Sequence, residues 1–264
     1  MTDYRRPGWV SAEQGREWIE QWSQILDVDT VCLFGGEPLL NRDIETWIDL
    51  VRQAWPLATI KVITNGVYLD RRNILPKLFE VGNAVYQVSL HWRSGPIFDK
   101  VKQNLIKQLH DYSGWSVIDQ NRSDLIMSMT RESLTVQLAV FGEFIKSYQG
   151  YGQSMMPWNS NDPEKSHSIC GSPANPILYK NRIYKCGPLG NLRDTLIMHQ
   201  LDQHPNWQPY LTAGYAPTDD LTELIDNFGK PNPACAMCSS NKSIAEIQHY
   251  RPGAVHEKGI TWQL

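Results

Sequence analysis

Helix-like and strand-like patterns alternate along the first half of the chain, and this alternation restricts the folds open to it. Ser11 and Gln14 form a capping-box pattern that predicts the start of a helix. Short apolar runs typical of buried strands occupy residues 30–34, 59–63 and 84–90. Helical spacing follows each run, including residues 96–110. Such alternation favours parallel strands joined by right-handed crossovers, so we expect an α/β fold.

The alternation weakens after residue 110. Residues 115–132 show no clear period, whereas residues 135–140 are typical of a strand, and we expect a helix from there to about residue 149. Turn-forming residues then dominate, and two β-prone runs flank Asn181-Arg182, a hairpin signal. The sequence therefore predicts a β/α domain over residues 1–150 and a smaller region over residues 151–264.

Charge and hydropathy exclude several classes of partner. The 264 residues carry a net charge of −3 with acidic and basic residues interspersed, which argues against a nucleic-acid surface. No stretch approaches the roughly 20 apolar residues of a membrane helix. The N-terminal residues lack the apolar core of a signal peptide. We therefore expect a cytoplasmic protein with no nucleic-acid or membrane partner.

A glycine-rich loop follows the first predicted strand. Gly35, Gly36, Glu37 and Pro38 stand at its carboxyl end, where parallel α/β sheets bind ligands. Glycine lets a backbone approach a ligand closely, glutamate could pair with an ammonium group, and proline stiffens the exit. The same residues could instead form a plain strand-to-helix turn with an exposed glutamate.

Cysteines are concentrated late in the chain. Cys170 and Cys186 bracket the predicted hairpin, and Cys235 and Cys238 form a C-x-x-C pair. In a reducing compartment this pattern favours a metal site over disulfides, and the four thiolates could hold either zinc or a [4Fe–4S] cluster. The fifth cysteine, Cys32, lies inside a predicted strand and is expected to be a core residue.

The glycine loop, with ITNG about twenty-five residues later, resembles the radical S-adenosylmethionine (SAM) enzymes. The resemblance implies a partial (β/α)6 TIM-like barrel lacking its first strand, with a small, hairpin-containing, cysteine-rich C-terminal extension. It also implies that SAM binds at the loops following successive strands. Mapped onto this chain, the SAM-binding residues are Gly35, Gly36, Glu37, Pro38, Thr64 and Asn65, with Ser89 and His91 of VSLHW as further contacts. It assigns no catalytic residue.

The cysteine-rich region resembles the twitch form of the SPASM extension of these enzymes. There a cysteine, a hairpin with glycine at its turn, a second cysteine and a distal C-x-x-C bind one auxiliary [4Fe–4S] cluster. Asn181 stands where that glycine would be. The resemblance implies radical-based modification of a small-molecule or peptide substrate, together with an electron donor. The alternative is a non-catalytic protein whose four cysteines bind zinc structurally.

The motif CX3CX2C, which holds the SAM-cleaving cluster in this superfamily, does not occur in the 264 residues. The first strand is also missing, because residues 3–14 resemble the stretch that enters the first helix of such enzymes. Three explanations are open: an N-terminal truncation, a degenerate homologue, or another chain that supplies the strand and its cluster. On each of them we expect this chain, an enzyme by lineage, to be inactive alone.

Overall fold

The computed structural model describes residues 8–91, 94–117, 124–141, 143–145, 147–241 and 244–246 of the chain. The first part of the fold comprises α1 (Ala12–Ser23), β1 (Thr30–Leu33), the 3₁₀ turn η1 (Pro38–Leu40), α2 (Ile44–Ala54), β2 (Thr59–Thr64), α3 (Leu75–Val81), β3 (Ala84–Leu90), α4 (Pro96–His110), β4 (Ser116–Val117), β5 (Leu125–Arg131), β6 (Leu134–Val140) and β7 (Glu143–Ile145). None of the described helices is long and apolar enough to cross a membrane.

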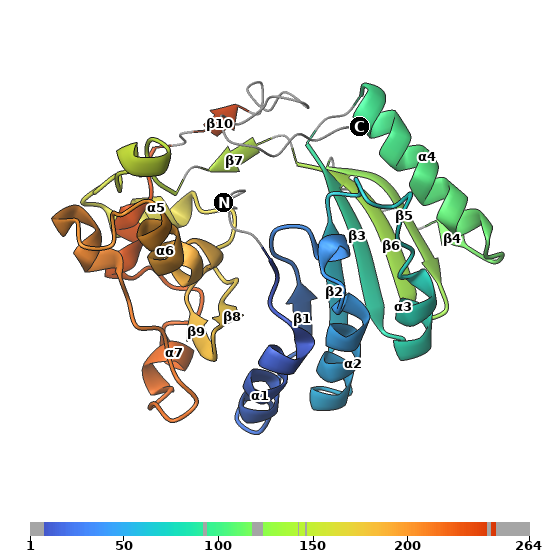
Figure 1. Cartoon of the computed structure of the whole chain (residues 1–264), viewed down its shortest axis with the longest axis horizontal. Coiled ribbons are helices and arrows are strands. Elements are labelled where there is room, and N and C mark those ends of the chain that lie inside the picture. Colours follow the sequence, from blue (N-terminus) through green and yellow to red (C-terminus); the bar gives the residue numbers. More distant parts are fainter. Residues whose placement is uncertain are drawn as a thin grey trace.

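The central sheet has six strands in the order β1-β2-β3-β6-β5-β4. Strands β1, β2, β3 and β6 run parallel, whereas β5 is antiparallel to β6 and β4 is antiparallel to β5. The mostly parallel sheet of a mixed α/β fold is as expected, while the (β/α)6 barrel itself stays a prediction. Figure 1 shows α2, α3 and α4 along one side of this sheet.

The expected helix ending near residue 149 is wrong. Residues 143–145 form β7, which pairs antiparallel with β10 (Ile244–Glu246), and Gln149 forms a β-bridge with Met156. Phe141, Phe144 and Ile145 are spaced like one face of a helix. Pairing with a strand about a hundred residues away overrides that local pattern, since strand formation depends strongly on tertiary context.

Helix starts follow local capping chemistry. The capping box at Ser11 and Gln14 is present at the start of α1, as predicted. At the start of α2, Asp43 occupies the N-cap position, and its backbone N–H donates to the side-chain oxygen of Asn41. Gly15 on α1 lets the Trp47 ring of α2 approach the α1 backbone closely, because a Cβ at Gly15 would lie 1.7 Å from that ring. The two helices therefore pack directly on each other.

The C-terminal part is built from short elements: η2 (Gly152–Ser154), α5 (Pro163–Ser168), β8 (Ile177–Tyr179), β9 (Arg182–Tyr184), α6 (Gly187–Met198), η3 (Pro205–Tyr210), α7 (Thr222–Asp226) and η4 (Pro233–Met237). A second hydrophobic cluster forms here around Trp207, Leu196 and Met237, each at most 1% exposed. It is separate from the main cluster under the sheet. The boundary expected at residue 150 stays a prediction.

The hairpin β8–β9 is present, but its turn lies one residue earlier than predicted. Lys180 and Asn181 both take positive φ (50° and 57°), the conformation of a two-residue hairpin turn that Asn tolerates well. The Asn181 side chain donates to Gln21 on α1 at 2.8 Å. Tyr179 makes an edge contact with Trp18. The C-terminal part therefore packs beside α1 and β1, as Figure 1 shows.

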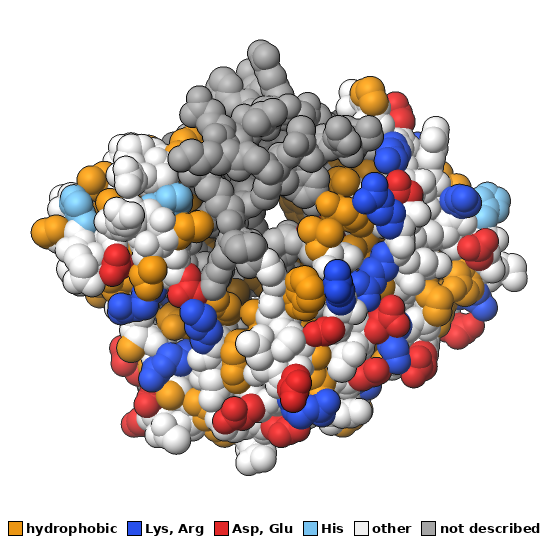
Figure 2. Space-filling view, in the orientation of Figure 1, with side chains coloured by type: hydrophobic (Ala, Val, Ile, Leu, Met, Phe, Trp, Pro, Cys, Tyr) orange, Lys and Arg blue, Asp and Glu red, His pale blue; other side chains and the backbone are white. Residues whose placement is uncertain are grey.

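Acidic and basic side chains are mixed over the face shown in Figure 2, with no large area of one sign. This distribution agrees with the interspersed charges of the sequence.

Candidate functional site

Two open glycines form the loop after β1. A Cβ added at Gly35 or Gly36 would meet no heavy atom within 4 Å, and both residues are exposed. Gly35 has φ +137°, a region that side-chain-bearing residues rarely adopt, whereas Gly36 needs no special conformation. The backbone at this strand end is therefore accessible to a ligand.

Glu37 joins the loop after β1 to the loop after β2. Its Oε1 accepts hydrogen bonds from the Leu39 backbone N–H at 2.9 Å and the Thr64 hydroxyl at 2.6 Å. Its Oε2 accepts from the Asn65 backbone N–H at 2.8 Å. Burial raises the pKa of Glu37, and these three hydrogen bonds oppose the rise. The side chain expected to meet an ammonium group is thus engaged within the protein, leaving the glycine backbone to meet a ligand.

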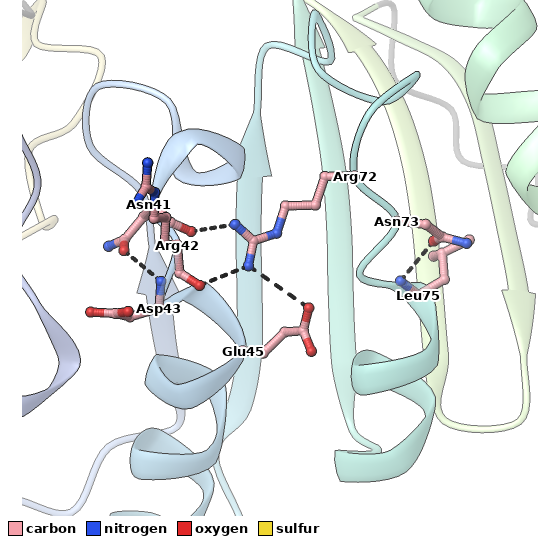
Figure 3. Close-up of polar contacts among 7 residues, drawn as sticks. All are labelled: Asn41, Arg42, Asp43, Glu45, Arg72, Asn73 and Leu75. Atoms are coloured by element: carbon pink, nitrogen blue, oxygen red, sulfur yellow. Dashed lines mark hydrogen bonds and ion pairs between the residues drawn. The ribbon is translucent and has the colours of Figure 1, made fainter.

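Arg72 makes a second connection between the same two loops (Figure 3). Its guanidinium donates to the backbone carbonyls of Asn41 at 2.6 Å and Arg42 at 3.0 Å, and lies 3.8 Å from the Glu45 carboxylate. Gln108 on α4 holds the other side of the loop after β2, donating to the backbone carbonyls of Leu69 and Arg72. The loop after β2 is therefore fixed from two directions, which pre-organises the strand ends.

Ser89 and His91 lie at the end of β3, at the same sheet edge as the glycine loop. The Ser89 hydroxyl accepts from the Gln87 amide at 2.8 Å. A ring nitrogen of His91 contacts the Phe141 carbonyl at 3.1 Å. Burial lowers the pKa of His91, opposed by this hydrogen bond, so the neutral imidazole is favoured. Both expected ligand contacts therefore have protein partners of their own.

The four late cysteines lie at the ends of short elements. Cys170 follows α5, Cys186 is the N-cap residue of α6, Cys235 lies in η4 and Cys238 caps it. The Ser166 hydroxyl of α5 donates to the Cys238 carbonyl at 3.1 Å and so connects α5 to the C-x-x-C segment. Elements far apart in the sequence thus bring the cysteines into one region.

The thiols of these cysteines influence one another electrostatically. Burial raises the pKa of Cys186 to about 11, opposed by the backbone N–H of Leu189, and the nearby Cys170 and Cys235 thiols add to the rise. Burial also raises the pKa of Cys238 to about 12, and Cys186, Cys170 and Cys235 each add to it. Cys186 and Cys238 therefore both lie within electrostatic reach of Cys170 and Cys235. Among the residues described, no group of three or more His, Cys, Asp or Glu side chains forms a site that could hold a metal ion.

Hydrogen-bond donors surround the sulfurs. The Ser172 backbone N–H donates to the Cys170 sulfur at 3.4 Å, and Leu189 supplies one to Cys186. The Ser147 hydroxyl, 6% exposed, bonds to the Cys238 thiol. Donors of this kind stabilise thiolates and tune iron–sulfur centres. Sequence reasoning missed Ser147, Arg72 and Gln108, because their partners come from tertiary contacts that leave no local pattern.

Cys32 lies in β1, as expected, and is partly buried. Burial raises its pKa to about 11, and the charge of Lys61 on β2 partly offsets this rise. It lies in the sheet and forms no part of the four-cysteine region.

Comparison with known proteins places residues 2–92 in the family described as the Radical SAM superfamily. GTP 3',8-cyclase from Aquifex aeolicus (strain VF5) is 40% identical over 78 residues, 28% of this chain and 24% of that protein. Molybdenum cofactor biosynthesis protein 1 from Bos taurus is 40% identical over 63 residues, 24% of this chain and 10% of that protein. The matches thus span a quarter or less of these curated relatives. They show a radical SAM superfamily domain at residues 2–92, the part that carries the glycine loop and the loop after β2.

Proposed function

We propose that this chain is a radical SAM-type protein that binds SAM at the loops after β1 and β2. The observation that carries the proposal is the three-bond connection from Glu37 to Leu39, Thr64 and Asn65 inside the matched superfamily segment. It fixes two strand-end loops beside a glycine backbone with open space around it. Ser89 and His91 would complete the site from the end of β3.

The residues present fit the cofactor's polar end. The exposed backbone at Gly35 and Gly36 can exchange hydrogen bonds with an amino acid moiety, because no Cβ stands in the way. Bound SAM would supply the radical chemistry of the reaction once reduced by a cluster. The protein's own residues would position the substrate and exclude water.

The second part of the proposal is an auxiliary [4Fe–4S] cluster held by Cys170, Cys186, Cys235 and Cys238. Support comes from the mutual influence of the four thiols and from the N–H donors at Cys170 and Cys186. Four thiolates can hold such a cluster, whereas the alternative is a single tetrahedral zinc ion on the same four side chains.

The SAM-reducing cluster would come from outside these 264 residues, which contain no CX3CX2C motif. Among the strands that the structure describes, β1 stands at the end of the sheet, and none of them pairs with its outer backbone groups. A further strand, from adjoining sequence or a partner chain, could extend the sheet there. An electron donor and a small-molecule or peptide substrate complete the proposed set of partners.

Gly36→Val tests the SAM site. The added side chain enters open space at an ordinary backbone conformation, so the variant is expected to fold like the wild type. If the loop backbone contacts SAM, equilibrium dialysis will show SAM affinity at least about tenfold weaker, a loss of about 1.4 kcal/mol. Gly171→Val, at another open glycine of ordinary conformation, is the matched control. Equal SAM affinity in both variants, or no SAM binding by the wild type, contradicts the proposal.

A further inference from the structure

Polar side chains form a row across three neighbouring strands of the sheet. Gln87 on β3 is directly paired with Gln137 on β6, and Gln137 is paired with Ser128 on β5. Their exposed fractions are only 5%, 8% and 4%. Strands of a buried parallel sheet are usually apolar on both faces. A buried polar row therefore points to a role other than packing.

The row lies on the face turned away from the helices. The alternate residues Tyr86, Val88 and Leu138 belong to the hydrophobic cluster that includes α3 and α4 residues. Side chains alternate between faces along a strand, so Gln87 and Gln137 point the other way. Ala139, fully buried on the strand face opposite Leu138, is outside that cluster. The polar face, hereafter the inner face, is thus the one turned away from α3 and α4.

Hydrogen-bonding capacity on this face is not fully used. The Ser128 hydroxyl is buried and has no partner in the described part of the protein. The Gln87 amide donates one hydrogen bond to the Ser89 hydroxyl. An amide side chain has a second N–H donor and an acceptor oxygen besides this one. Burying a hydroxyl such as that of Ser128 without a partner costs about 1–3 kcal/mol in general, so its presence favours an external partner.

The chemistry of the row indicates what that partner presents. Paired residues on adjacent strands stand about 4.8 Å apart, so the two glutamine amides offer donors and acceptors side by side. In the neighbouring row, Lys61 supplies a positive charge close to Cys32. Ser89 lies about 7 Å further along β3, toward the strand end that bears His91. Asp and Glu are missing from the alternating inward positions of β2, β3 and β6.

We propose that Gln87, Gln137 and Ser128 form a hydrogen-bonding floor that recognises a substrate bearing an amide-type edge. Such an edge carries a donor and an acceptor side by side and occurs in nucleobases and in peptide amides. Lys61, in the neighbouring row of the same face, favours neutral or anionic molecules over cationic ones. This inference rests on the proposed function, since the floor would orient a substrate below the SAM loops.

The test uses small probes with purified wild-type chain and with Gln87→Met and Gln137→Met, which keep side-chain length but remove the amide. Uridine probes the nucleobase source, N-acetylalanine methylamide probes the peptide source, and sucrose is a hydroxyl-only control. Saturation-transfer NMR is expected to detect one of the first two probes on the wild type. Its signal should fall at least fivefold in both variants, and sucrose should give none. Gln103→Met, at an exposed position of α4, should bind like the wild type.

Thermal unfolding without any probe separates a binding role from a structural one. If the amides are kept for a ligand, both methionine variants will melt at or above the wild-type temperature. A fall of more than about 4 °C in both would show that the amides stabilise the fold, and would overturn the inference. Probe binding that is equal in the wild type and the variants, or absent from all, would overturn it as well.

Iron content and SAM binding of the wild type, measured separately, distinguish this inference from the proposed function. If the wild type holds an iron–sulfur cluster and binds SAM but no probe depends on the glutamines, the floor alone is wrong. If probes bind through the glutamines in a protein that holds no iron and binds no SAM, the proposed function is wrong and the floor stands.

Discussion

Replacing Glu37 by glutamine removes one acceptor from the connection between the loops after β1 and β2. The amide oxygen can keep the hydrogen bonds from Leu39 and Thr64 that Oε1 accepts, at 2.9 and 2.6 Å. In the wild type, the Asn65 backbone N–H donates to Oε2 at 2.8 Å. In the variant, the amide NH₂ of the glutamine takes the place of Oε2 and faces this N–H. Two donors cannot bond to each other, so the Asn65 N–H loses its partner.

The expected loss follows from that single bond. A hydrogen bond to a charged group contributes about 1.5–3 kcal/mol to stability. The variant no longer buries a charged carboxylate, and this gain in stability offsets part of the loss. We expect Glu37→Gln to lower the free energy of unfolding by about 2 kcal/mol. In urea unfolding the midpoint should fall with an unchanged m-value.

Glu45→Gln is the matched control, because in the described part of the protein the side chain of Glu45 makes a 3.8 Å ion pair with Arg72 and is 48% exposed. Exposed pairs of this kind contribute about 0–1 kcal/mol. If Glu37→Gln is as stable as Glu45→Gln, or more stable than the wild type, Glu37 does not hold the two loops together.

The pH dependence of the same variant has a definite sign. Burial raises the pKa of Glu37 in the folded protein above its ordinary value of 4.5. A raised pKa means that the folded state binds the proton more tightly than the unfolded state does, so this contribution to stability is present at low pH. It is lost as pH rises through the folded pKa. The stability difference between wild type and Glu37→Gln should therefore widen on acidification toward pH 4.5, and a narrowing difference would contradict the assigned direction.

Two further predictions concern packing and loop fixation. Arg72→Lys keeps the charge but loses the fork that reaches the Asn41 and Arg42 carbonyls, so urea unfolding should show a loss of about 1–2 kcal/mol; an unchanged midpoint would mean that the guanidinium is dispensable. Gly15→Ala should destabilise by about 1–3 kcal/mol, because its Cβ would lie 1.7 Å from the Trp47 ring, although alanine normally favours a helix interior. The loss should shrink when Trp47→Leu is also present, and an equal loss in both backgrounds would refute the clash.

Local patterns predicted the elements whose residues carry strong periodicity. The bounds of β3 (Ala84–Leu90) and α4 (Pro96–His110) are those expected from sequence. Pro96 at the first helical position and a continuous apolar stripe fix α4 locally. The loops at Gly35 and Thr64 were located because glycine and short polar residues mark strand ends.

Non-local contacts account for what the sequence did not reveal. Strand β7 pairs with β10, about a hundred residues away in the sequence, so no local period identifies it. Strand β5 lies within residues 115–132, which show no clear period. The role of Glu37 was read as ligand binding, because only the folded structure shows that Thr64 and Asn65 occupy both of its oxygens. Similarly, the polar inner face becomes visible only when the register places Gln87 beside Gln137.

The metal content of anaerobically purified protein tests the central claim most directly. Elemental analysis with labile-sulfide assay should give about four irons and four sulfides per chain, with the broad absorption of a thiolate-ligated [4Fe–4S] cluster. Cys186→Ser should lose the iron, whereas Cys32→Ser, outside the four-cysteine region, should retain it. Zinc without iron in the wild type, or iron that survives Cys186→Ser and is lost in Cys32→Ser, would contradict the account.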